Sequence, residues 1–340
     1  MTQLTYLEAA VVGLIQGVTE LFPISSLGHN VLLPALVGGS WAADLNVASS
    51  ESPYLAFVVG LHVATAIALL IYFWRDWVRI VRGFFSSLGQ LVRPAAGTSR
   101  WQLQSADERL AWLIVVATIP VGLVGLVFEH EFRVLFGKPI RAAIFLVING
   151  LILLAGEFFR RKASVRADQE IAHERELVAV GSARRTGTAR HAAGHQAERE
   201  AEYEQGIQSD QRLSTQGYLS ALLIGTAQIL ALLAGISRDG VAMVAGMFRG
   251  LSREDAARFA FLLATPVILA AGVLKVPDLM GPLGNGIRGQ ILVGSVLSGV
   301  GAYLSVRFLV RYFRTRTLTP FAIYCIVVGL GSAIYLSLVQ

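Results

Sequence analysis

The chain has 340 residues, of which 54% are hydrophobic and only 15% are charged, and its mean hydropathy is +0.58. This composition excludes an ordinary soluble globular protein and indicates an integral membrane protein. The formal net charge is +6, but the arginines flank apolar runs, as in cytoplasmic loops, so no nucleic-acid partner is expected. The single cysteine, Cys325, excludes an intrachain disulfide and a zinc site built from thiolates.

Apolar runs of two lengths follow one another along the chain. Two short ones, Leu4–Ile15 and Leu219–Leu233, are interrupted by glycine, proline or charge and continue into a second short arm, as re-entrant segments do. Six longer ones approach the ~20 residues of a membrane-spanning helix, namely Tyr54–Trp74, Leu110–Phe128, Ala142–Phe159, Phe259–Leu274, Ile291–Val306 and Phe321–Val339. Because lipid tolerates only backbone that is hydrogen-bonded internally, the spans should be helical. The sequence predicts an all-α integral membrane protein with six transmembrane helices and two re-entrant helical hairpins.

The two interrupted stretches resemble each other. GLIQGVTELFPIS (Gly13–Ser25) and GTAQILALLAGIS (Gly225–Ser237) match at the glycine, the glutamine, one leucine and the final Ile-Ser. Each copy is followed by three spans, which predicts a first repeat over residues 1–159 and a second over 217–340. An odd number of spans in each copy gives the copies opposite orientations, so we expect an inverted repeat.

Between the repeats, residues 160–216 carry many charges of both signs and little apolar periodicity. This pattern predicts a flexible cytoplasmic insert, either disordered or a solvated helix. The arginine-rich loops after Trp74, Phe159 and Val306 fall on one side of a six-span arrangement, and the positive-inside rule makes that side cytoplasmic. Both termini then lie outside, the first hairpin enters from outside, and the second enters from the cytoplasm.

The hairpins carry an unusual set of polar residues. A carboxylate in the middle of a membrane costs at least ~2.5 kcal/mol, so such groups are usually functional or shielded. If the tips meet, the polar side chains of the first face those of the second: Gln16, Glu20, Ser25, Ser26 and His29 on one, Ser237, Arg238 and Asp239 on the other. A guanidinium fork, hydroxyls and helix N-termini together suit a phosphate group. The set therefore predicts an anion-binding pocket.

Each residue also has a simpler interpretation. Serines near helix ends are most often caps, and Glu20 with Arg238 is also readable as a structural ion pair. His29 alone is equally compatible with a hydrogen-bonded core histidine. His62 lies inside the first span and is interpreted as a buried structural hydrogen-bonding residue.

Two motifs resemble a known family. QGVTELFPISSLGH (Gln16–His29) is similar to the (E/Q)GxTEFLPVSSxGH signature of the undecaprenyl-pyrophosphate phosphatases of the bacitracin-resistance type. AGISRDGVAM (Ala234–Met243) resembles a degraded form of that family's PGxSRSGxT, and the likeness covers nearly the whole chain outside the insert. The resemblance implies hydrolysis of a C55 isoprenyl diphosphate to the monophosphate, which recycles the lipid carrier of cell-wall synthesis. It also implies a bacterial plasma membrane, an active site open to the outside, and a divalent cation such as Mg²⁺ or Ca²⁺.

The resemblance also implies residue roles. Glu20 would be the general base or a metal ligand, Ser26 the nucleophile or a phosphate donor, His29 the acid–base partner and Arg238 the phosphate clamp. Whether Ser26, His29 or a water attacks stays open. The remaining hairpin-tip residues would bind the substrate: Gln16, Ser25, Ser237 and Asp239. The expected partners are the polyprenyl diphosphate and the surrounding membrane lipids, and the sequence leaves a homodimer open.

The second motif departs from the family pattern at three positions. Ala234, Asp239 and Ala242 stand where the family has proline, serine and threonine. A carboxylate beside the anion-binding arginine costs several kcal/mol unless a cation intervenes, so Asp239 is also predicted, with Glu20, to be a metal ligand. Because of this departure, two alternatives stay open. One is a transporter or flippase for a polyprenyl phosphate or another anion, since inverted repeats are common in transporters. The other is an inactive lipid-binding paralogue.

Overall fold

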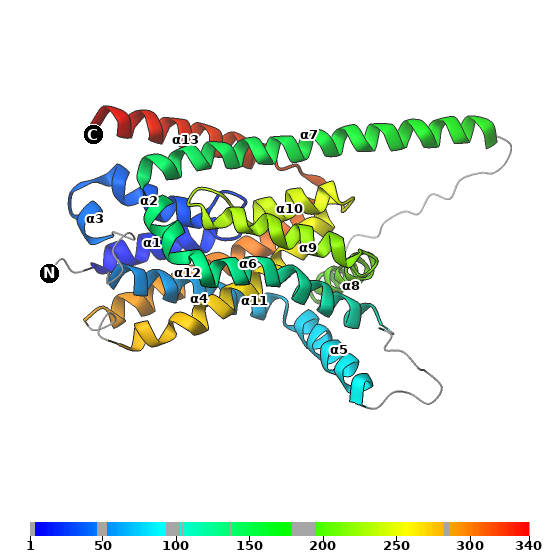
Figure 1. Ribbon diagram of the computed structural model, residues 1–340, viewed down its shortest axis with the longest axis horizontal. Coiled ribbons are helices and arrows are strands. Elements are labelled where there is room, and N and C mark those ends of the chain that lie inside the picture. The colour runs from blue at the N-terminus through cyan, green and yellow to red at the C-terminus, as the bar shows by residue number, and fades with distance from the viewer. Residues whose placement is uncertain are drawn as a thin grey trace.

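A computed structural model describes residues 4–45, 53–92, 103, 105–136, 138–178, 195–281 and 286–339. Throughout these residues the regular secondary structure is helical, and most helices run alongside one another (Figure 1). The elements in chain order are α1 (Tyr6–Thr19), α2 (Ser26–Val37), α3 (Gly39–Asp44), α4 (Pro53–Tyr72), α5 (Trp74–Val92), α6 (Ala106–Phe136), α7 (Pro139–Val178), α8 (His195–Ser214), α9 (Tyr218–Ala227), the 3₁₀ helix η1 (Gln228–Leu232), α10 (Arg238–Phe248), α11 (Arg253–Met280), α12 (Arg288–Thr315) and α13 (Thr319–Val339).

The helices confirm an all-α integral membrane protein. Five of the described helices, α6, α7, α11, α12 and α13, are each long and apolar enough to cross a membrane alone. The sixth predicted span, Tyr54–Trp74, corresponds to α4, which meets the same test only together with α5 across a bend of 86°. A second bent pair, α8 with α9, turns by 105°. The described helices thus provide between five and seven candidate spans.

The segment after Trp74, predicted to be an arginine-rich loop, is instead the helix α5. Its buried face, which includes Ile80 and Ser87, packs against α6, whereas Val78 and Phe85 on the other face are exposed. Apolar residues recur here at helical spacing between the arginines. The prediction of a loop considered only the arginines and not this spacing. It was therefore wrong, and the arginines closest to Trp74 belong to a helix.

Both interrupted stretches are helical hairpins. In the first, α1 begins with a capping box between Thr5 and Glu8 and is joined to α2 by residues 20–25. In the second, α9 and η1 are joined to α10 by residues 233–237. Figure 1 shows α1 and α2 at one end of the bundle and α9 and α10 toward the other, so the hairpin tips approach each other in the interior.

Helix contacts support the inverted repeat. Helices α7 and α13 pack closely, and a Cβ on Gly150 would lie 2.7 Å from the carbonyl oxygen of Ala322. In return, a Cβ on Gly329 would lie 2.8 Å from the carbonyl oxygen of Ala143. Gly150 is thus equivalent to Gly329, and Ala143 is equivalent to Ala322, in two antiparallel helices. A pseudo-two-fold axis between the helices relates the two contacts.

The same symmetry relates the first helix of each hairpin to a span of the other repeat. Gly13 of α1 packs against the backbone of Gly294 in α12, and Gly225 of α9 packs against the backbone of Ala117 in α6. Gly13 and Gly225 are the first matching residues of the two similar sequence stretches. Only glycine permits such close backbone approach, so the sequence match corresponds to an equivalent contact in each repeat.

The segment predicted to be a flexible insert is partly built into the bundle. Helix α7 continues beyond the predicted boundary at residue 159 as far as Val178, and residues 179–194 lie outside the described part of the chain. Helix α8 packs against α6 and α11 and buries Asp210, which accepts hydrogen bonds from Arg258 at 2.7 Å and Arg79 at 2.5 Å. The expected solvated helix is thus wrong for this end of α8, because its buried charge is paired with arginines from distant sequence.

Candidate active site

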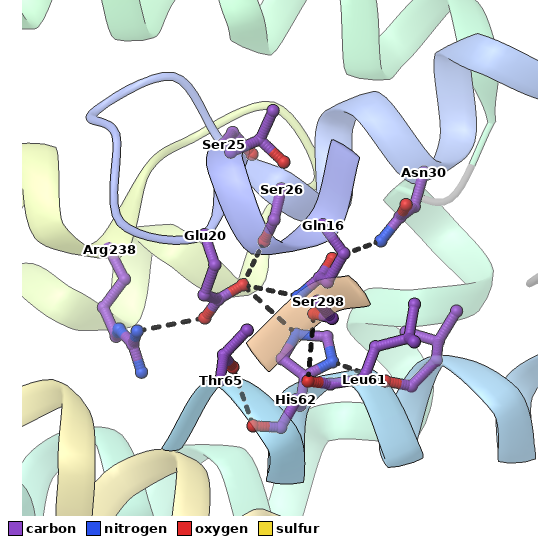
Figure 2. A network of polar contacts seen from close by, with 12 residues as sticks. Gln16, Glu20, Ser25, Ser26, Asn30, Leu61, His62, Thr65, Arg238 and Ser298 are labelled. Carbon is purple, nitrogen blue, oxygen red and sulfur yellow. Dashed lines mark hydrogen bonds and ion pairs between the residues drawn. The ribbon is translucent and has the colours of Figure 1, made fainter. Parts of the chain in front are cut away.

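Glu20, directly after α1, is the centre of a polar network between the two hairpin tips (Figure 2). Its Oε2 accepts hydrogen bonds from Gln16 Nε2, at 2.8 Å, and from the Ser26 hydroxyl. The His62 Nε2 lies 3.4 Å from the same oxygen, and Arg238 Nη2 donates to Oε1 at 3.1 Å. Glu20 is only 9% exposed. Its carboxylate therefore joins α1, α2, α4 and α10 at one point.

Ser25 shapes the first tip. Its backbone has φ of 69°, a left-handed conformation that is uncommon for a residue with a side chain. Ser25 is the N-cap of α2, and its hydroxyl oxygen accepts a hydrogen bond from the Gly28 amide at 3.2 Å. The same oxygen accepts a second hydrogen bond, also at 3.2 Å, from the Gly235 amide of the second tip. The interpretation of Ser25 as a cap is confirmed, and the same oxygen connects the two hairpins.

Ser237 has the corresponding position in the second tip. Its hydroxyl accepts a hydrogen bond from the Gly240 amide at 3.1 Å and caps α10, which places Arg238 in the first turn of that helix. The Arg238 guanidinium reaches back to Glu20. Asp239 is 1% exposed; its Oδ1 lies 3.4 Å from Arg238 Nε, and its Oδ2 has no hydrogen-bond partner within the described structure.

His29 lies on the side of α2 that meets α13. Its Nδ1 is 2.7 Å from the carbonyl oxygen of Ser25, its Nε2 is 2.8 Å from the Tyr324 hydroxyl, and its ring stacks on that of Tyr324. The structure therefore brings together five of the eight predicted site residues in one contact network, Gln16, Glu20, Ser26, Arg238 and Asp239. Ser25 and Ser237 cap the helices that carry the network, and His29 adjoins it.

Sequence reasoning missed the contact of His62. The Nδ1 of His62 lies 2.8 Å from the carbonyl oxygen of Val58, as expected for a structural hydrogen bond, but the side chain is 29% exposed and not buried, and its Nε2 faces Glu20. Asn30 was also missed: it is fully buried and donates to Gln16 Oε1 at 2.7 Å. That bond leaves the amide nitrogen of Gln16 to face Glu20. A polar residue inside an apolar segment was the available signal, but spacing along one helix does not reveal which helix lies opposite.

The arrangement brings a hydroxyl, a carboxylate and a guanidinium together. The Ser26 hydroxyl hydrogen-bonds to the Glu20 carboxylate, which is the geometry of an activated nucleophile. Arg238 and the N-termini of α2 and α10 lie at the same tips and favour bound anions. The site is thus equipped to hold a phosphate group and to transfer a proton next to it.

Carboxylates at the hairpin tips are the available ligands for a divalent cation. Within the described residues, no three His, Cys, Asp or Glu side chains form a metal-binding group. Mg²⁺ is commonly held by one or two carboxylates together with substrate phosphates. The buried, unpartnered Oδ2 of Asp239 beside the Arg238–Glu20 pair is compatible with such a shared site.

Residues 9–331 match the model of the family described as bacitracin resistance protein BacA. The chain belongs to the BacA family. Curated relatives include the undecaprenyl-diphosphatase of Mycolicibacterium paratuberculosis, 57% identical over 336 residues and covered to 98% in both chains. Undecaprenyl-diphosphatase 2 of Frankia alni is 53% identical, with 97% of each chain covered. Undecaprenyl-diphosphatase 2 of Chromobacterium violaceum is 37% identical, over 97% of this chain and 98% of the relative. The family resemblance drawn from the two sequence motifs is confirmed.

Proposed function

We propose that this BacA-family protein is a membrane phosphatase that hydrolyses undecaprenyl diphosphate to undecaprenyl monophosphate and inorganic phosphate. This reaction would return the lipid carrier to cell-wall synthesis. The observation that carries the proposal is the Glu20 carboxylate, which contacts both the Ser26 hydroxyl and the Arg238 guanidinium. Relatives named undecaprenyl-diphosphatase that align along almost the whole chain support the same activity.

In the proposed reaction, the Ser26 oxygen attacks the terminal phosphorus while its proton passes to Glu20. The bond from that phosphorus to the bridging oxygen breaks, and the lipid monophosphate leaves. Water then hydrolyses the phosphoserine, releases phosphate and restores the hydroxyl. The hydrogen bond between Ser26 and Glu20 favours Ser26 over His29, whose ring nitrogens face Ser25 and Tyr324. We retain His29 as a proposed acid–base group.

Arg238 would bind the diphosphate as it enters. Without substrate its guanidinium is paired with Glu20 Oε1. The guanidinium is a planar fork of donors, and two phosphate oxygens bind such a fork more strongly than a single carboxylate oxygen does. Transfer of Arg238 to the phosphate frees that oxygen of Glu20. Positioning and charge neutralisation are the main contributions a protein makes to phosphoryl transfer.

A direct test is phosphate release from undecaprenyl diphosphate by purified protein in detergent micelles. We expect one phosphate for each lipid consumed. No release with Mg²⁺ or Ca²⁺ at any concentration would exclude a phosphatase and leave the transporter and the inactive paralogue. Flux of a polyprenyl phosphate across vesicles without release would favour the transporter.

We further propose that Asp239 and Glu20 hold Mg²⁺ or Ca²⁺ with the substrate phosphates. Such an ion would neutralise phosphate charge. EDTA should therefore abolish release, and added Mg²⁺ should restore it. Asp239→Ser with Ala242→Thr should raise the Mg²⁺ concentration needed, because the change removes one of the two carboxylates proposed to hold the ion. Unchanged activity and metal dependence in that variant would exclude Asp239 from the site.

We also propose that the protein lies in the bacterial plasma membrane with the site open to the outside. Figure 1 shows α3 at the opposite end of the bundle from α5 and α8, and the arginines of α5 mark their end as cytoplasmic. In intact cells, Ser40→Cys in α3 should react with an impermeant thiol reagent, and Glu204→Cys in α8 should not. Both positions are exposed, so equal labelling would contradict the proposed orientation.

A further inference from the structure

A buried asparagine in α7 joins the two hairpin tips. Asn149 is 0% exposed, although it lies within the candidate span Pro139–Lys162. Its Nδ2 donates to the carbonyl oxygen of Pro23 in the first tip at 2.9 Å. Its Oδ1 accepts from the backbone amide of Ser237 in the second tip, also at 2.9 Å. One side-chain amide therefore holds the backbone of both tips.

The two backbone groups have a direct connection to the active site. Pro23 is three residues after Glu20, and Ser237 immediately precedes Arg238. The two hairpin tips that Asn149 bridges therefore carry the Glu20 carboxylate and the Arg238 guanidinium, which lie 3.1 Å apart. Buried backbone groups outside regular helix bonding need a partner from elsewhere, and Asn149 satisfies one group on each side with a single rigid side chain.

The bridge exists in only one of the two repeats. The reciprocal contacts of Gly150 and Gly329 fix the register between α7 and α13, so the residue equivalent to Asn149 is Val328. Valine has no hydrogen-bonding group in its side chain. The helix packing is thus nearly symmetric at this point, whereas the polar bridge is not.

We propose that Asn149 is a positioning residue, which sets the distance between Glu20 and Arg238 by fixing the hairpin tips to α7. The inference rests on the proposed diphosphatase activity for its kinetic consequence, but not for its structural one. Asn149 does not touch the reacting groups. It acts through Pro23 and Ser237, so its loss should displace the Arg238 guanidinium while the fold of the spans remains.

The kinetic test uses Asn149→Ala, with Val328→Ala as the matched control at the equivalent position. Because a displacement of about 1 Å costs on the order of 10²-fold in rate, Asn149→Ala should lower kcat and kcat/KM by about 10²-fold. Val328→Ala should change them little. In an Arg238→Lys background the loss from Asn149→Ala should nearly disappear, because the two changes disrupt one interaction. Additive losses would overturn the proposal.

The structural test measures hydrogen exchange and needs no activity. Asn149→Ala should accelerate exchange in peptides that cover residues 20–27 and 233–240, and Val328→Ala should not. Asn149→Leu keeps the branched side-chain shape without the hydrogen bonds and should behave like Asn149→Ala. Unchanged exchange in both Asn149 variants, or failure of both to fold, would overturn the positioning role. If the wild-type protein released no phosphate but the exchange result held, the proposed function would fail and the bridge would stand.

Discussion

Glu20→Gln should reduce phosphate release by about 10³-fold, because it removes the only carboxylate in contact with the Ser26 hydroxyl within the described structure. Glutamine has nearly the same shape, but its amide has one acceptor oxygen where Glu20 uses two. It cannot accept the Ser26 proton, and its NH₂ group would face the donors that now converge on the carboxylate. The measurement is kcat for undecaprenyl diphosphate at saturating Mg²⁺.

Glu8→Gln is the matched control. Glu8 is also a buried carboxylate of α1, but it accepts hydrogen bonds from Thr5 in a capping box at the far end of the helix. Glutamine at this position can also complete a capping box. We expect Glu8→Gln to lower the melting temperature slightly and to retain catalysis. Equal activity in Glu20→Gln and wild-type protein would remove Glu20 from the mechanism.

Arg238→Lys should lower kcat/KM by about 10²-fold even though the positive charge is kept. The Arg238 guanidinium donates to Glu20 from Nη2 while Nε points toward Asp239. A lysine ammonium is a point charge and cannot present two parallel donors to a phosphate. Arg249→Lys, at the other end of α10, is the control, because Arg249 donates to Ser220 away from the tips.

The same pair of variants separates a phosphate clamp from a structural ion pair. If Arg238 mainly holds the repeats together, Arg238→Lys should lower thermal stability and leave kcat/KM of the folded protein nearly intact. If it binds phosphate, the kinetic loss should appear in protein whose melting temperature is close to that of Arg249→Lys. Near-normal turnover in Arg238→Lys would reduce Arg238 to a structural role.

The parts of the fold that depend on local pattern were predictable. Gly13 and Gly225 opened two similar stretches, and their matching contacts accompany the two hairpins. The polar residues around Pro23 predicted a pocket if the hairpin tips met, and a Glu20–Arg238 ion pair was one interpretation, since an unpaired carboxylate is costly in a membrane. These inferences needed only the sequence repeat and the free-energy cost of burying a charge in a membrane.

The contacts that depend on which helix lies opposite were not predictable. His62 and Asn149 are single polar residues in otherwise apolar spans, and their roles come from α4 and α7 packing against the hairpin tips. Likewise, Asp210 belongs to a segment with the composition of a solvated insert, but it is buried by its pairing with Arg258. Such partners are separated by as many as 126 residues, and a single sequence does not show which residues on two distant helices lie opposite each other.

The central claim is that the two hairpin tips form one diphosphate site. Hydrogen exchange with and without a non-hydrolysable methylene analogue of farnesyl diphosphate tests it most directly, because binding is measured at each tip separately. We predict that saturating analogue slows exchange in peptides covering residues 20–27 and 233–240 together, over the same concentration range. Protection confined to one tip, with the other unchanged, would contradict a shared site.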